Sequence, residues 1–300
     1  MKSLTQRVMW FALIALLMPL GAQSAFGDLV GDDSGDLIGV DNDTGDLYAV
    51  STADASLSYI GSTGLDKLGS LEYWNGSLYG MTNGSKFAID PNDRPALYRF
   101  DLNASQTAVT AVVKIGTDSG LGLSTFEGGL AFGPDGTAYG VNEGSTGDAT
   151  LFSVDLGTGA GTPIGIVSNV PHDINGLSWR SDGMLIGLDR ESQSLLVIDP
   201  VTLGISVLAP VSEAIGGIGG MVLAGEVGYF ATAGPGQTVP GSNALYSFDP
   251  YTGDYGYVGN FNLPPDGSLE GISGLAVIPE PASLALLAFG GMALLRRRRK

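Results

Sequence analysis

A repeat of about 50 residues is the feature that most constrains how this chain of 300 residues can fold. A strand-like segment begins with Leu, often continues with an aromatic residue and often ends in Asp. It starts at Leu47, Leu97, Leu151, Leu195 and Leu245, so the starts lie 50, 54, 44 and 50 residues apart. Because a regular spacing over five copies marks a repeat architecture, we expect five similar structural units.

A second segment precedes most of these starts and consists of Gly, an apolar residue, a spacer and another apolar residue. It occurs at 129–132, 176–179, 220–223 and 274–277, and 70–73 is a variant with Ser70 in place of Gly. The unit from Gly176 contains four strand signals, separated by turn sequences such as Ser181-Asp182-Gly183. Four short strands in roughly 45–50 residues are the content of one β-propeller blade.

The two ends of the repeat complement each other. The last unit stops after one strand signal, at 274–278. The N-terminal unit has three strand signals, at 34–41, 47–50 and 57–60, but no preceding Gly-Leu segment. Joined together they complete a fifth blade, and a closed ring removes the exposed strand edges of an open array. The sequence therefore predicts an all-β fold, a single five-bladed β-propeller closed by its N-terminal strands. A β-sandwich or an open solenoid would leave the half-units unexplained.

The first 27 residues have the pattern of a secretory signal peptide. Lys2 and Arg7 precede an apolar run at 8–20, and small residues follow it. Thirteen apolar residues in a helix span ~20 Å, short of the ~30 Å hydrocarbon core, so a signal helix is favoured over an uncleaved anchor. We expect residues 1–27 to be the signal peptide, 28–278 the propeller and 279–300 a separate tail.

The tail has three parts in order: a Pro-Glu-Pro triplet, an apolar run at 282–295 and a basic cluster. The residues concerned are Pro279, Glu280, Pro281, Arg296, Arg297, Arg298, Arg299 and Lys300. This arrangement resembles the PEP-CTERM sorting signal of Gram-negative bacteria. A plain tail anchor is the alternative.

The resemblance has implications for the fate of the protein. It implies recognition of the triplet by an exosortase-type membrane protease and transient membrane association through a short hydrophobic C-terminal helix. It further implies removal of the tail and delivery to the cell surface or the extracellular matrix. Such sorting systems typically accompany exopolysaccharide production.

Charge and cysteine content exclude several functions. Between Asp28 and Pro279 the chain has seven basic and 30 acidic residues, a net charge of −23. Such a body repels nucleic acid, whose binding requires Lys and Arg to neutralise phosphates, but it is compatible with neutral glycans or cations. The chain has no cysteine, which excludes disulfides, thiolate metal sites and cysteine catalysis.

Asp-rich segments of the chain could form a calcium-binding site, because calcium takes six to eight oxygen ligands. Asp41 and Asp43 are the best candidate ligands, but the following Gly45 and Thr52 break the EF-hand spacing. Asp followed by Gly is also ordinary turn chemistry, and we favour that interpretation. We expect no other cofactor.

Polar residues gather just before the Gly-Leu segments, where the blades of a propeller converge near one face. The candidate ligand-binding residues are Glu127, His172, Asp173, Asn175 and Glu270. His172 is the only histidine, which excludes a multi-histidine metal site, and no nucleophile-elbow sequence is present.

Two main functions remain open at this point. The first is a non-catalytic surface propeller that binds exopolysaccharide or envelope proteins, which the absence of a catalytic motif favours. The second is a secreted carbohydrate-active enzyme that uses carboxylates of the central channel, such as Glu127, Asp173 and Glu270, for acid–base chemistry. A calcium-stabilised structural surface protein is a third hypothesis.

Overall fold

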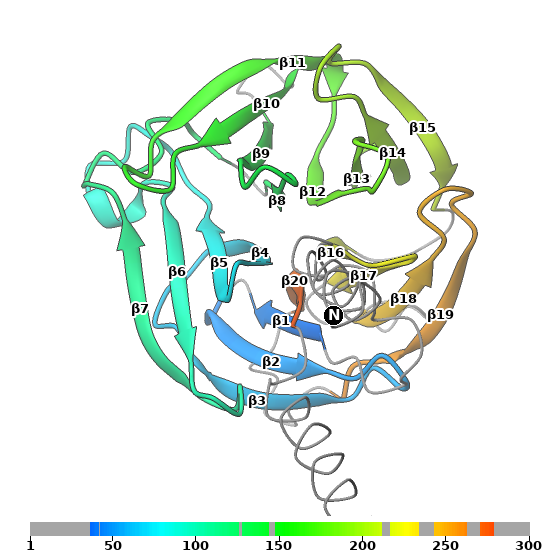
Figure 1. The fold of residues 1–300 in the computed structure, drawn as a ribbon, viewed down its shortest axis with the longest axis horizontal. Coiled ribbons are helices and arrows are strands. Elements are labelled where there is room, and N and C mark those ends of the chain that lie inside the picture. Colours follow the sequence, from blue (N-terminus) through cyan, green and yellow to red (C-terminus); the bar gives the residue numbers. More distant parts are fainter. Residues whose placement is uncertain are drawn as a thin grey trace, which may run out of the picture. The chain divides into compact units, whose positions relative to one another are not determined.

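Five four-stranded antiparallel sheets surround a common axis in the computed structural model of this chain (Figure 1). The structure describes residues 37–41, 43–125, 128–143, 148–211, 217–233, 243–262 and 271–278. Within these ranges the only helix is a short 3₁₀ turn, η1 (Pro91–Asp93). The prediction of an all-β, five-bladed propeller is confirmed. The expected signal helix and C-terminal helix lie outside the described residues.

Each blade is one sheet, whose strands follow one another from the axis outward. The closing blade contains β20 (Ile272–Val277), β1 (Leu37–Asp41), β2 (Asp46–Val50) and β3 (Leu57–Ser62). The second contains β4 (Leu68–Trp74), β5 (Ser77–Thr82), β6 (Leu97–Leu102) and β7 (Val109–Ile115). The third contains β8 (Leu130–Phe132), β9 (Ala138–Glu143), β10 (Asp148–Val154) and β11 (Gly161–Pro171). The fourth contains β12 (Ile174–Trp179), β13 (Leu185–Asp189), β14 (Ser194–Ile198) and β15 (Ile205–Pro210). The fifth contains β16 (Gly217–Ala224), β17 (Val227–Ala233), β18 (Ala244–Phe248) and β19 (Tyr255–Asn260).

Strands from the two ends of the described chain close the ring. In Figure 1, β20 (orange-red) lies beside β1 (blue), and Leu37 is paired with Val277 in an antiparallel register. The half-unit at 274–278 therefore completes the blade begun by the N-terminal strands, as the sequence predicts. Closure at this blade pairs β20 with β1, so neither half-unit is left as an incomplete sheet.

Apolar side chains fill the space between neighbouring blades. Between the fourth and fifth blades, for example, Ile186 and Leu188 share a cluster of buried side chains with Met221 and Phe230. Phe230 also stacks on Tyr246, with ring centroids 5.0 Å apart. Because such clusters lie between sheets, burial of apolar surface stabilises the packing of the blades against one another.

The five first strands run in the same direction, since equivalent residues of neighbouring strands meet around the ring. The ring therefore has two distinct faces. We call the face where the first strands begin the entry face; it holds the connections from second to third strands and from blade to blade. We call the other the exit face; it holds the turns from first to second and from third to fourth strands.

Candidate functional site

Small residues bring the five first strands into close contact at the axis. A Cβ atom added to Gly176 would lie 2.4 Å from the Met221 Cβ, and one added to Gly129 would lie 2.5 Å from the Leu177 Cβ. A Cβ atom added to Gly220 would lie 2.4 Å from the Gly274 Cα, and one added to Gly274 would lie 2.8 Å from the Leu71 nitrogen. The Gly of the repeated Gly-Leu segment is therefore required by the approach of the neighbouring backbone.

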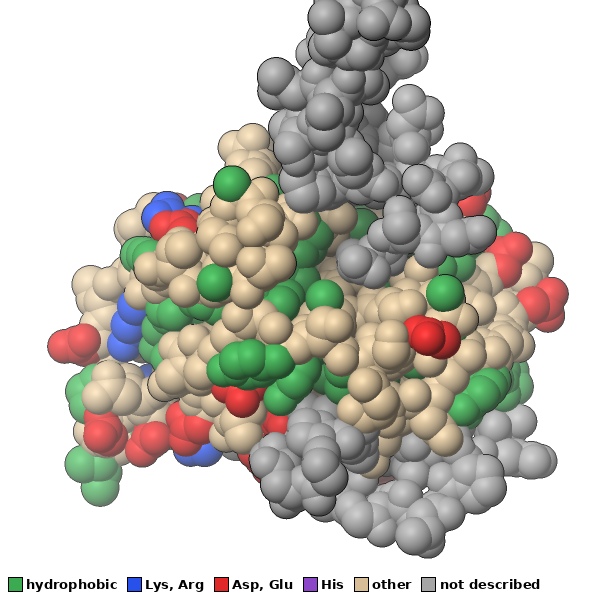
Figure 2. All heavy atoms as spheres, turned by 90° about the horizontal axis from the view of Figure 1, so that it is seen from below, with side chains coloured by type: hydrophobic (Ala, Val, Ile, Leu, Met, Phe, Trp, Pro, Cys, Tyr) green, Lys and Arg blue, Asp and Glu red, His purple; other side chains and the backbone are tan. Residues whose placement is uncertain are grey.

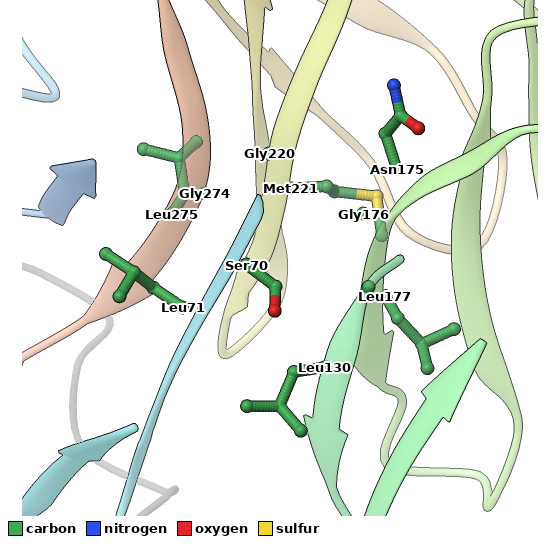
Figure 3. A pocket seen from close by; sticks show the side chains of 11 residues that line it. Ser70, Leu71, Leu130, Asn175, Gly176, Leu177, Gly220, Met221, Gly274 and Leu275 are labelled. Carbon is green, nitrogen blue, oxygen red and sulfur yellow. The ribbon is translucent and has the colours of Figure 1, made fainter. Parts of the chain in front are cut away.

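This glycine ring closes the centre of the propeller. The space at the axis is lined by main chain and by side chains such as Leu130, Leu177 and Leu275, each from a different strand (Figure 3). Among the described residues it has no room for a water molecule. The second blade has Ser70 in place of Gly, and its buried side chain points into this space. A ligand at the entry face must therefore bind above the ring of small residues, because a through-channel is absent from the described part of the axis.

A second ring of residues lies at the entry-face ends of the second strands. The equivalent positions are all polar: Asp41, Thr82, Asn142, Asp189 and Thr232. The Thr82 hydroxyl donates to the Ala96 carbonyl and accepts from the Ala96 N–H at 3.0 Å, and Thr232 makes the same pair of bonds with Ala244. In these blades the side chain fastens the second strand to the third.

One of the two candidate calcium ligands, Asp41, belongs to this ring, and Asp43 lies in the turn that follows it. Asp41 is buried, and its Oδ1 accepts a hydrogen bond of 2.8 Å from the Asp43 N–H. That geometry is the turn interpretation favoured from the sequence. In the ranges that the structure describes, no group of three or more His, Cys, Asp or Glu residues is arranged to hold a metal ion. Calcium binding by Asp41 and Asp43 stays a prediction.

The fourth blade gathers the most chemically diverse cluster, around Asp189 at the end of β13. His172 Nδ1 lies 2.6 Å from Asp189 Oδ2, and the Asp173 N–H donates to Asp189 Oδ1 at 2.8 Å. The Ser192 N–H donates to Oδ2 at 3.1 Å, and the Ser192 hydroxyl donates to the same oxygen. Asp189 is fully buried, and its carboxylate holds His172 and Asp173, the two residues that lead into β12, in position.

The structure brings two of the predicted ligand-binding residues, His172 and Asp173, into this cluster, whereas Asn175 lines the space at the axis (Figure 3). His172 and Asp173 enter β12, and Asn175 lies within it; all three side chains are largely buried. Asp173 pairs with Arg190 at 2.6 Å, and the Arg190 side chain is 49% exposed. Arg190 thus presents the positive charge of this cluster to the solvent. Glu127 and Glu270 lie outside the described residues.

The hydrogen-bond pattern bears on catalysis. In a serine relay the hydroxyl donates to the histidine, which then removes its proton. Here the Ser192 hydroxyl donates to Asp189, so His172 and Ser192 share a carboxylate and do not form that relay. The arrangement orients the imidazole and the loop around it, which suits polar recognition.

Two residues of interest were missed in the sequence. Asp189 could have been found from the alignment of the repeats, since the equivalent position near the end of each second strand is polar. Glu72 could have been found as the acid at a position occupied by Ala131, Ser178, Val222 and Ala276 in the other blades. Desolvation raises the pKa of Glu72 to about 8, so its carboxyl is mainly neutral at pH 7.

The fold and the closed axis define a five-bladed β-propeller, and comparison with solved structures finds similar chains. The chain is similar to one in the crystal structure of a nidogen/laminin complex, with 12% identity over 82% of this chain and 98% of that one, and a TM-score of 0.52. TolB from Acinetobacter baumannii matches at 16% identity over 78% of this chain and 55% of its own, with a TM-score of 0.45. An auxiliary nutrient binding protein from Bacteroides ovatus matches at 14% identity over 83% and 63%, also with a TM-score of 0.45. No curated protein matches the sequence.

The C-terminal tail gives more specific information about the protein than the propeller fold does. Residues 277–300 match the PEP-CTERM protein-sorting motif, which confirms the resemblance seen in the sequence. The motif implies an exported protein that an exosortase, a membrane protease, processes at the membrane. The processing residues Pro279, Glu280 and Pro281 and the four arginines from Arg296 lie outside the described residues. Within the described ranges, no helix is long and apolar enough to cross a membrane.

Proposed function

We propose that this protein is an exported, non-catalytic propeller that binds matrix exopolysaccharide or an envelope protein through its entry face. The observation that carries the proposal is a sorting motif at 277–300 attached directly to a closed propeller. After removal of the tail, the propeller is delivered to the cell surface or the extracellular matrix of a Gram-negative bacterium. The glycine ring supports surface binding, because a polymer has no path through the described axis.

The charge of the body indicates which ligands it accepts. The propeller segment carries a net charge of −23, and acidic side chains outnumber basic ones on the face that Figure 2 shows. A strongly anionic polysaccharide would be repelled over most of this surface. We therefore expect a neutral glycan stretch or a basic protein segment as the ligand.

The cluster around Asp189 is the part of the entry face that we assign to ligand contact. The guanidinium of Arg190 supplies several N–H donors in a fixed geometry, and Asp173 holds it in place. His172 lies beside it with its ring oriented by Asp189. Together these groups can hydrogen-bond the hydroxyl or carbonyl oxygens of a neutral ligand.

A binding experiment with a matched pair of variants tests the proposal. Polysaccharide and envelope proteins from the matrix of producing cells are titrated with the processed protein and with Arg190→Ala. We expect Arg190→Ala to weaken binding about tenfold, equivalent to about 1.4 kcal/mol. Arg99→Ala is the control, since Arg99 also pairs with an aspartate, Asp101, and its side chain is 40% exposed, but it lies on β6. Failure to retain either class of matrix component, or equal losses in both variants, would contradict the proposal.

A further inference from the structure

The sorting motif begins inside the propeller. Its first residue, Val277, is the last residue of β20, and Ile278 is only 9% exposed. Ile278 packs with Ile38 and Leu47 in the buried cluster between the closing blade and the second blade. The ring and the Pro-Glu-Pro triplet are therefore joined without a spacer.

The register of β20 determines the face at which the tail leaves. Val277 lies at the exit-face end of β20, and its partner Leu37 begins β1 at the same face. The chain consequently enters and leaves the ring on one side. We propose that the exit face of the propeller lies against the membrane surface for as long as the tail is attached, with the entry face pointing away. This inference goes beyond the proposed function, because it holds whichever ligand the entry face binds.

The short segment between the propeller and the apolar run supports this orientation. Ile278 is separated from Ala282, the first residue of the apolar run, by Pro279, Glu280 and Pro281. Four Cα steps span at most ~14 Å in an extended chain. The polar headgroup layer on each side of a bilayer is roughly 5–8 Å thick. If the apolar run begins in the hydrocarbon layer, little more than one further layer of side chains fits between Ile278 and the headgroups.

The charge of the exit face explains how the propeller can leave again. Its turns contain a set of carboxylates whose pKa is lowered by hydrogen bonds within their own turns, so they stay ionised at neutral pH: Asp54, Asp135, Asp155, Asp182, Asp199 and Asp249. An anionic lipid surface within a Debye length of ~8–10 Å repels such a face. The tail alone therefore holds the propeller at the membrane, and its removal releases the propeller.

Fluorescence quenching on vesicles tests the orientation with the full chain. The absence of cysteine allows single labelling sites on opposite faces of two blades. Ser105→Cys and Val201→Cys lie in exit-face turns, whereas Ile89→Cys and Glu191→Cys lie in exposed entry-face connections. Each labelled chain is reconstituted into phosphatidylcholine and phosphatidylglycerol vesicles that carry a quencher on the headgroup. We expect severalfold stronger quenching at 105 and 201 than at 89 and 191, and the use of two blades averages out any tilt.

A spacer provides the control. About 20 Gly and Ser residues inserted between Ile278 and Pro279 add an average span of about 25 Å, and the difference between the two faces should then disappear. Equal quenching on both faces of the original chain, stronger quenching on the entry face, or failure of the full chain to associate with vesicles would overturn the proposal. The assay contains no glycan, so its outcome is independent of the ligand experiment.

Discussion

Leu37 and Val277 face each other across the pair of strands that closes the ring, although 240 residues separate them in the sequence. The pair belongs to the blade that joins the two ends of the described chain. The ring can therefore open at this blade only if β1 separates from β20, and a bond between these two strands should oppose opening there.

A disulfide at this pair tests that dependence. In Leu37→Cys/Val277→Cys the paired register brings the two Cα atoms within the range that a disulfide spans. We expect the oxidised form to be more stable than the reduced form of the same protein by about 3–5 kcal/mol, because the bond closes a very long loop. Denaturant unfolding with and without reductant measures the difference. The absence of other cysteines makes the assignment unambiguous, and an unchanged midpoint on reduction would show that this pair does not control ring opening.

Gly176 should tolerate no side chain. In Gly176→Ala the new methyl group would lie 2.4 Å from the Met221 Cβ and 2.8 Å from the Met221 backbone nitrogen, so two first strands would have to separate. We expect a loss of about 1–3 kcal/mol in unfolding free energy, as for other overpacked cores. Gly256→Ala on the exposed strand β19 is the control, because its nearest neighbour lies 4.0 Å from the added Cβ, and it should be neutral or slightly stabilising. Equal stability of both variants would mean that the axis is less tightly packed than these distances indicate.

Strand spacing and turn sequences were sufficient to predict the closed ring, because complementary half-units at 274–278 and 34–60 can be recognised without knowing any contact. The closed axis could not be predicted, since a Gly at 176 is equally compatible with a turn, a bulge or close packing. The same limit applies to the cluster around Asp189. Asp189 reaches the Asp173 N–H across 16 residues, and only the pairing of β12 with β13 brings the two together.

The partly buried acid Glu72 should make stability depend on pH. Desolvation raises its folded pKa to about 8 from an ordinary value of 4.5, so between these values the folded chain holds a proton that the unfolded chain has released. The unfolding free energy should therefore fall as pH rises from about 4.5 to about 8, and Glu72 should add no further change above that range. In Glu72→Gln this part of the decline should be absent. Thermal unfolding of both proteins between pH 5 and pH 9 measures it.

The control for this experiment is Glu226→Gln, which changes an exposed glutamate in the turn between β16 and β17. It should leave the pH profile of the original chain unchanged. If Glu72→Gln and the original chain lose stability in parallel as pH rises, the carboxyl of Glu72 is ionised in the folded protein.

Removal of the Asp189 carboxylate should destabilise the fourth blade more than removal of an aspartate in an exposed turn. Asp189→Ala leaves the buried N–H of Asp173 and the partly buried N–H of Ser192 without their acceptor, and it removes the partner of the His172 ring. We expect a loss of about 2–4 kcal/mol in unfolding free energy. Asp199→Ala removes an acceptor of two turn N–H groups that water can replace, so its loss should be clearly smaller. Equal losses would show that the cluster contributes no more than an ordinary turn, whereas the expected order would establish Asp189 as the residue that fixes the entry to β12.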